Sequence, residues 1–244
     1  RPLRLIAQAI VEDRGTVHSI VDFQGSPHNY SLTPTDRINM QQADLLLRVS
    51  PEFEIFLADI FASQSRSKPL ITAASISGIS LHNLDDGNAD LHLWLNTENA
   101  ISIAQQLAIS LIGLDPENEK EYQEALNQFE SDVALLNRSL QNRLSQYQQP
   151  DYLVYHDAYQ YFENHFNISA SGAISLGDAS DPSPARLSEI RKRIADESIH
   201  CVLAEPQYND GLVKAVVEGT DSNTAIIDAL GVGLKVGPSL YNEL

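Results

Sequence analysis

The feature that most constrains the fold is a long stretch, residues 116–149, that contains no glycine and, after Pro116, no proline. Its apolar residues recur at steps of three and four, at Tyr122, Leu126, Phe129, Val133, Leu136, Leu140, Leu144 and Tyr147. This spacing predicts one amphipathic helix of roughly 50 Å, which Pro150 ends. Such a helix is longer than a small domain is wide, so we expect it to join two lobes as a stiff rod. The alternative is two ordinary helices with an unmarked break.

Around this helix, short apolar runs alternate with segments that carry helix start signals. The expected strands are Val17–Val21, Asp44–Val49, Tyr152–Tyr155, His200–Ala204 and Thr224–Ile227. Several are apolar throughout, as strands buried on both faces should be. Capping side chains precede proline at Thr33-Pro34, Ser50-Pro51, Asp115-Pro116 and Ser183-Pro184. The alternation favours an α/β fold with parallel sheets, and residues 80–90 are interpreted as a loop.

Charge and composition exclude several classes of function. The 244 residues include 16 basic and 33 acidic side chains, a net charge of −17, which argues against nucleic-acid binding. No apolar run approaches the ~20 residues of a membrane span, so we expect no membrane insertion. Arg1-Pro2-Leu3 is not a natural start, and a processed or cropped chain is expected. The single cysteine, Cys201, excludes a cysteine-based zinc cluster, so a metal here needs His, Asp or Glu ligands.

Residue types that bind divalent metals follow the expected strands, where ligands of parallel sheets bind. They are His28, His92, His156, Asp157, Glu205 and Asp228. His92 comes just before a helix expected to start near Asn96-Thr97. The alternative is that each is a structural cap or loop residue. The other histidines, His18, His82, His165 and His200, are interpreted as structural, with His82 as a possible auxiliary contact.

At these same positions the sequence resembles the ZnuA-type proteins, the periplasmic zinc-binding components of bacterial ABC importers. The similarity lies in five motifs in the same order, which are Gly25-Ser26-Pro27-His28-Asn29-Tyr30 with Thr33-Pro34-Thr35-Asp36, His92-Leu93-Trp94-Leu95, His156-Asp157-Ala158-Tyr159, Cys201–Gln207 and Asp228-Ala229-Leu230-Gly231. The resemblance implies two α/β lobes, each with a small parallel sheet flanked by helices, joined by one long rigid helix. It places a metal in the cleft between the lobes.

The resemblance also implies the division of the chain and the ligand set. The expected units are an N-terminal lobe (1–114), the linker helix (115–149) and a C-terminal lobe (150–244) that ends before an expected final helix. Residue by residue, the ligands would be His28 and His92 from the first lobe, and His156 and Asp228 from the second. Three imidazoles and one carboxylate suit zinc, one ion per chain, with manganese as the alternative. Asp157 and Glu205 would orient a ligand from outside the coordination shell.

The implied function is capture of zinc in the periplasm by a monomer and its delivery to an ABC permease in the inner membrane. Three alternatives stay open from the residues alone. They are a manganese or iron carrier or adhesin on the same scaffold, a zinc hydrolase, and a metal-free interaction protein. A hydrolase needs an open coordination position, which a fourth ligand at Asp228 would fill, so we expect no enzyme.

Overall fold

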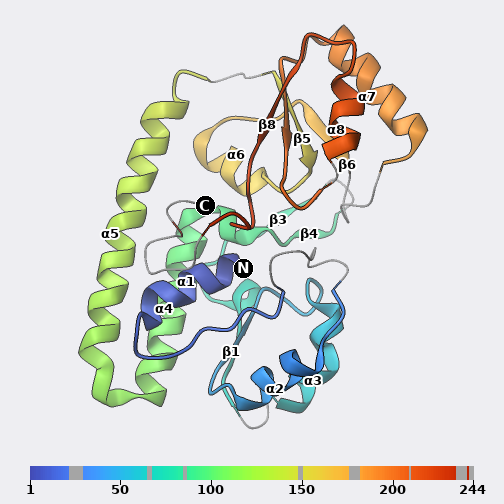
Figure 1. Cartoon of the computed structure of the whole chain (residues 1–244). Coiled ribbons are helices and arrows are strands. Elements are labelled where there is room, and N and C mark those ends of the chain that lie inside the picture. Colours follow the sequence, from blue (N-terminus) through green and yellow to red (C-terminus); the bar gives the residue numbers. More distant parts are fainter. Residues whose placement is uncertain are drawn as a thin grey trace.

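The computed structural model describes residues 1–21, 30–64, 68–84, 87–147, 151–175, 182–208, 210–234 and 241 (Figure 1). The α-helices are α1 (Pro2–Val11), α2 (Pro34–Gln42), α3 (Ala58–Gln64), α4 (Thr97–Leu114), α5 (Glu119–Leu144), α6 (Gln160–Phe166), α7 (Pro184–Asp196) and α8 (Asp210–Val217). The strands are β1 (Leu46–Arg48), β2 (Leu70–Thr72), β3 (His82–Asn83), β4 (Ala89–Asp90), β5 (Tyr152–His156), β6 (Gly172–Ser175), β7 (Cys201–Ala204) and β8 (Asn223–Ile226). Short 3-10 helices lie at Ile55–Leu57, Ala73–Ser75, Leu93–Leu95 and Pro116–Asn118.

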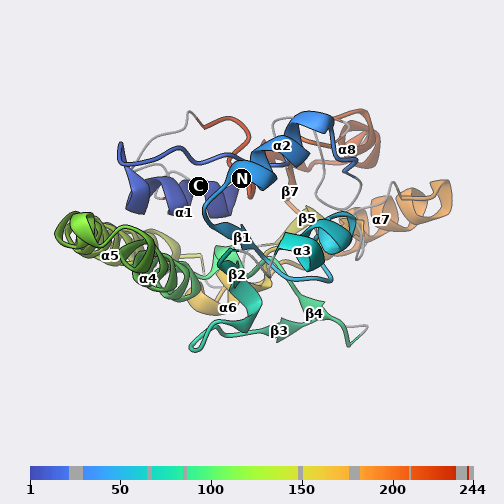
Figure 2. The same ribbon diagram turned by 90° about the horizontal axis from the view of Figure 1, so that it is seen from below.

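The first half of the chain builds its core from helices α1, α4 and α5. Figure 2 shows α4 and α5 side by side, with α1 next to them, and the three helices are in contact. Their apolar faces bury Ile6, Ile10, Ile103, Leu107 and Phe129 in one cluster. The parallel pair of β1 and β2, with Leu46 opposite Leu70, adjoins this core through Val49 and Ile71. Leu93 and Trp94, which follow β4, belong to the same core, so it holds that segment in place.

The long helix is present as α5, a single helix of 26 residues, and not as two helices with a break. At 1.5 Å per residue it is about 39 Å long, shorter than expected because residues 116–118 form a 3-10 helix instead and because α5 ends at Leu144, before the expected Gln149. The Asp115 carboxylate accepts hydrogen bonds from Asn118 (2.7 Å) and Tyr122 (3.0 Å) at this start. The predicted apolar stripe is buried from Tyr122 to Val133 and only half-buried at Leu136 and Leu140, where α5 runs beyond the first core (Figure 1).

The second half of the chain contains a four-stranded parallel sheet in the order β6-β5-β7-β8. Helices α7 and α8 cover one face, where their side chains pack against Leu153, Tyr155 and Val202. The opposite face buries Tyr152 and Val154 with residues of the turns that follow β5 and β8. The connections between successive strands contain helices α6, α7 and α8, as the α/β interpretation predicted. The carboxyl end of central strand β5 is His156.

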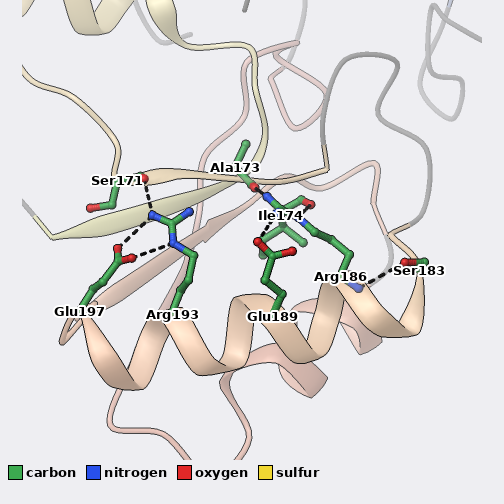
Figure 3. A network of polar contacts seen from close by, with 8 residues as sticks. All are labelled: Ser171, Ala173, Ile174, Ser183, Arg186, Glu189, Arg193 and Glu197. Carbon is green, nitrogen blue, oxygen red and sulfur yellow. Dashed lines mark hydrogen bonds and ion pairs between the residues drawn. The ribbon is translucent and has the colours of Figure 1, made fainter.

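Arginines of α7 protect the outer edge of β6 (Figure 3). Arg186 donates to the carbonyl of Ala173 (2.9 Å), and Arg193 donates to that of Ser171 (2.9 Å). Gly172 has φ +154°, and a side chain there would meet the Arg193 guanidinium at 3.0 Å. An edge strand exposes unpaired backbone groups, and these arginines occupy some of them.

Four of the five expected strands are present with shifted ends, as β1, β5, β7 and β8, but Val17–Val21 is not a strand. A strand needs a neighbour for its backbone hydrogen bonds. In the described part of the chain β1 pairs with β2 alone, so residues 16–21 do not pair with it. Instead, β1 and residues 16–21 both line a cavity of about 660 Å³. Strand β8, one of the two edges of its sheet, is exposed along its whole length, against the expected burial.

The proline start signals are correct where the capping side chain reaches the backbone. Thr33 accepts from the Asp36 N–H at the start of α2, and Ser183 accepts from the Arg186 N–H at the start of α7. Ser50-Pro51 is a turn and not a helix start, so that prediction is wrong. Residues 80–90 are likewise more than a loop, because β3 and β4 pair antiparallel, with His82 opposite Asp90.

Candidate metal centre

Two of the predicted ligands, His92 and His156, face each other across the two halves of the chain. His156 ends β5, and His92 lies between β4 and the 3-10 helix at Leu93–Leu95. Their Nε2 atoms are 3.1 Å apart, and their rings meet edge to face with centroids 4.9 Å apart. The two residues are 7% and 2% exposed. Two neutral nitrogen donors from distant parts of the sequence therefore converge on one point.

The spacing of the two nitrogens suits a shared metal ion. Two imidazoles that bind one tetrahedral zinc at about 2.0–2.1 Å hold their nitrogens about 3.3 Å apart. The same spacing also suits a direct hydrogen bond between the rings when no ion is bound. Nδ1 of His92 lies 2.8 Å from a carboxylate oxygen of Asp90, so we assign the His92 proton to Nδ1. The lone pair of His92 Nε2 then faces His156.

The His92 imidazole is held on several sides. The backbone N–H of His92 donates to the same oxygen of Asp90 (3.0 Å). The rings of Trp94 and Phe53 lie against the imidazole, with centroids 5.3 and 6.0 Å away. Helix α4 begins directly after this segment, where the Asn96 side chain accepts from the N–H groups of Glu98 and Asn99. The expected helix start at Asn96-Thr97 is therefore confirmed.

Asp228 follows β8, and the residue after it, Ala229, is linked to His92 through Trp94, whose ring lies against the imidazole. The Trp94 indole donates to the carbonyl of Ala229 (2.9 Å). The Asp228 carboxylate accepts from the N–H groups of Val232 (2.9 Å) and Gly233 (2.8 Å), within its own loop. Within the described ranges, no three His, Cys, Asp or Glu side chains lie close enough to hold one ion. Asp228 thus does not complete a three-residue group with His92 and His156.

The remaining predicted residues have different surroundings. His28 lies outside the described residues. Asp157 is half-buried directly after His156. Glu205, after β7, is 2% exposed and accepts from the side chain of Gln207 (2.6 Å). Burial, with a smaller contribution from the charge of Asp228, raises the pKa of Glu205, and hydrogen bonds from neighbouring side chains oppose the rise, so that the pKa is about 7. Within the described part of the chain, the Glu205 carboxylate makes no hydrogen bond to an imidazole.

The histidines interpreted as structural lie apart from the pair or pack against other rings. His18 and His200 are exposed, and His165 packs on Phe166 within α6. His82 packs edge to face on Tyr161, with ring centroids 4.5 Å apart. The residue that the sequence interpretation missed is Asp90, the direct partner of His92. Its position two residues before a predicted ligand is the signal that could have pointed to it.

No helix in the described ranges is long and apolar enough to cross a membrane. The family model "ZnuA: Zinc-uptake complex component A periplasmic" matches residues 1–243. A high-affinity zinc uptake system protein of Brucella abortus (strain 2308) is 29% identical over 287 aligned residues, which cover 100% of this chain and 86% of the relative. The protein of the same description from Yersinia pestis is 30% identical over 272 residues, covering 99% and 84%.

Solved structures share the fold. A crystal structure of ZnuA superposes with a TM-score of 0.86 at 21% identity, covering 99% of this chain and 92% of that one. The solute-binding protein FpvC of Pseudomonas aeruginosa, in complex with Mn²⁺, superposes with a TM-score of 0.84 at 18% identity, covering 99% and 90%. The family match over residues 1–243 decides the identity. The chain belongs to the ZnuA family of periplasmic zinc-uptake components, and it is a metal-binding solute-binding protein, not an enzyme.

Proposed function

We propose that this protein captures one Zn²⁺ ion between its two halves and delivers it to an ABC permease in the inner membrane. The ligands in this proposal are His28, His92, His156 and Asp228. The observation that carries it is the approach of His92 and His156 to 3.1 Å between their Nε2 atoms. Relatives from Brucella abortus and Yersinia pestis that are described as zinc uptake proteins support the same cargo.

The choice of zinc over manganese rests on the donor atoms. A relative of the same fold is described in complex with Mn²⁺, so the fold alone does not select the ion. Manganese is favoured by sites rich in carboxylate and carbonyl oxygen, whereas imidazole suits zinc. The proposed set has three imidazoles and one carboxylate. We therefore expect zinc to bind more tightly, with manganese as the alternative cargo.

We also propose how the chain divides into structural units. Residues 1–114 and 150–244 are the two lobes, and residues 115–149 are the rigid linker. In support, α5 packs on α1 and α4 at its start and contacts α6 of the second half further along. A stiff connection of this kind disfavours wide hinge opening, so release of the ion would come from small shifts of the loops that hold the ligands.

A competition titration tests the cargo and its stoichiometry. Protein stripped of metal by a chelator is titrated with Zn²⁺ and with Mn²⁺ by calorimetry, and bound metal is counted by elemental analysis. We expect one Zn²⁺ per chain, which Mn²⁺ in excess does not displace, and a monomer by light scattering. Tighter binding of Mn²⁺ would overturn the zinc assignment. Binding of neither ion would overturn the capture proposal as a whole.

The ligand set is tested with a matched pair of histidine variants. His156→Ala should lose most of the zinc affinity because it removes one of the two facing nitrogens. His200→Ala, on an exposed residue beside β7, should bind zinc like the unaltered protein. Equal binding isotherms for the two variants would remove His156 from the proposed site.

A further inference from the structure

Asp90 is a buried carboxylate that no prediction from the sequence assigned to the site. It is the last residue of β4 and is 1% exposed. One of its oxygens, Oδ1, lies 2.8 Å from Nδ1 of His92 and also accepts the His92 backbone N–H at 3.0 Å. The acid and the imidazole therefore form a compact unit whose second ring nitrogen, His92 Nε2, faces His156.

The backbone on both sides of this carboxylate is fixed. Strand β4 pairs with β3, so that Asp90 lies opposite His82. The Asp90 carbonyl accepts a hydrogen bond of 2.6 Å from the hydroxyl of Tyr161, which belongs to α6 in the other half of the chain. Because its main chain is anchored in this way, the Asp90 side chain has little freedom to leave the imidazole.

The Asp90 carboxylate is only partly satisfied by hydrogen bonds among the described residues. Its second oxygen, Oδ2, is buried and makes no hydrogen bond within the described residues. A buried carboxylate in this condition costs free energy unless positive charge is nearby. A divalent ion on Nε2 of His92 would supply that charge, and it would strengthen the Nδ1–H bond to the carboxylate at the same time.

From this geometry we propose that Asp90 is the positioning residue of the metal centre, an inference that rests on the proposed function. Asp90 keeps the His92 proton on Nδ1 and the lone pair of Nε2 directed at the ion. It also makes the imidazole a better donor to a cation. This is the role that the sequence analysis expected of Asp157 and Glu205, but it is Asp90 whose contact with a proposed ligand the structure describes.

The first test reads the His92 tautomer in metal-free protein by long-range ¹H–¹⁵N correlation, at a pH where the imidazole is neutral. We expect an Nδ1–H imidazole in the unaltered protein and a shift towards Nε2–H in Asp90→Ala. A His92 that carries its proton on Nε2 in the unaltered protein, or a tautomer that Asp90→Ala leaves unchanged, overturns the proposal. Because no metal is present, this outcome is independent of whether zinc is the cargo.

The second test measures zinc affinity by chelator competition. Loss of a partner of this kind typically weakens metal binding about 10- to 100-fold, and we expect that range for Asp90→Ala. Asp90→Asn keeps a carbonyl acceptor but loses the charge, so we expect a smaller loss. It carries the affinity test if circular dichroism shows that the alanine variant does not fold.

Asp115→Asn serves as the control for removal of one carboxylate in the same half of the chain, since Asp115 bonds to Asn118 and Tyr122 and not to an imidazole. Its zinc affinity should equal that of the unaltered protein. Unaltered affinity in Asp90→Asn, or in a folded Asp90→Ala, overturns the positioning role. Failure of the unaltered protein to bind zinc overturns the proposed function instead, so the two failures are distinguishable.

Discussion

At the scale of single residues, the two proposed histidine ligands should make metal binding depend on pH. Histidine changes its charge between pH 5 and pH 8, and a protonated imidazole cannot bind a cation. We expect zinc affinity to fall by more than about tenfold between pH 7.5 and pH 5, because protons compete at His92 and His156 together. A competition titration at both pH values measures this. Equal affinity at the two would mean that these histidines do not bind the ion.

Glu205 predicts a different pH dependence, in the stability of the metal-free protein. Burial raises the pKa of Glu205 from its ordinary 4.5 to about 7. The folded state therefore holds a proton that the unfolded state releases, and the free energy of unfolding falls as pH rises from about 4.5 to about 7. The full effect would be at most about 4 kcal/mol, from 1.4 kcal/mol per unit of pKa.

Glu205→Gln removes this ionisation and keeps the shape of the protonated acid. We expect the variant to unfold at the same urea concentration as the unaltered protein at pH 4, and at a higher concentration at pH 8. A difference in midpoint that does not grow between the two pH values would show that Glu205 ionises at its ordinary pKa. Metal-free samples are needed, because bound metal adds its own stabilisation.

Residues of the site were predictable where a position after a strand carries a metal-binding side chain. His156 comes directly after an apolar run, and the expectation that it lies at a sheet end is confirmed, since it ends β5. Asp90 was missed for a physical reason. Its role depends on the short pairing of β3 with β4, which is two residues long in each strand and leaves no periodic pattern in the sequence.

At the scale of elements, helix α7 offers a direct comparison of two arginines. Arg193 donates to the carbonyl of Ser171 and pairs with Glu197, and it is partly buried against β6 (Figure 3). Arg191, two residues away, pairs only with the exposed Glu218 among the described residues. Hydrogen bonds from a charged group to a buried partner contribute more to stability than exposed ion pairs do.

We therefore expect Arg193→Met to lower the free energy of unfolding by about 1–2 kcal/mol. Arg191→Met should change it by less than about 0.5 kcal/mol. Urea denaturation of the two metal-free variants measures both values. Equal destabilisation would mean that the bond to the β6 edge adds nothing to an ordinary surface pair.

The elements that the sequence predicted well are those whose own pattern determines them. Helix α5 has its apolar stripe, and α2 and α7 have capping side chains that reach the backbone. Strands depend on neighbours, and Val17–Val21 shows the consequence. Its residues have the apolar, β-branched character of a strand, yet it pairs with no described strand. Strands β2 and β6, which no expected run covered, are likewise defined by the partners beside them.

At the scale of the whole molecule, the relative placement of the two halves could not be derived from spacing. The predicted ligands are far apart in sequence, and only the resemblance to a family indicated that they meet. The structure shows which contacts bring the halves together. The Trp94 indole bonds to Ala229, the Tyr161 hydroxyl bonds to Asp90, and Arg1 bonds to the carbonyls of Gly231 (3.0 Å) and Leu234 (2.9 Å).

These contacts predict that removal of metal changes the overall shape little. None of these bonds needs an ion, and the hydroxyl of Tyr241 adds a further one, to the Trp94 carbonyl at 2.7 Å. A compact chain of this length has a radius of gyration of about 18 Å. We expect solution X-ray scattering to give the same radius with and without Zn²⁺, within about 1 Å.

The double variant Trp94→Phe with Tyr161→Phe tests whether these hydrogen bonds, and not the ion, hold the two halves of the protein together. It keeps an aromatic ring at both positions but removes three hydrogen bonds between the halves, because phenylalanine lacks the indole N–H that bonds to Ala229 and the hydroxyl that bonds to Asp90 and His82. If these bonds hold the halves together, the metal-free variant should scatter with a larger radius, and Zn²⁺ should restore the smaller one. Unaltered protein whose radius falls clearly on addition of Zn²⁺ would instead show that the ion, and not these contacts, closes the molecule.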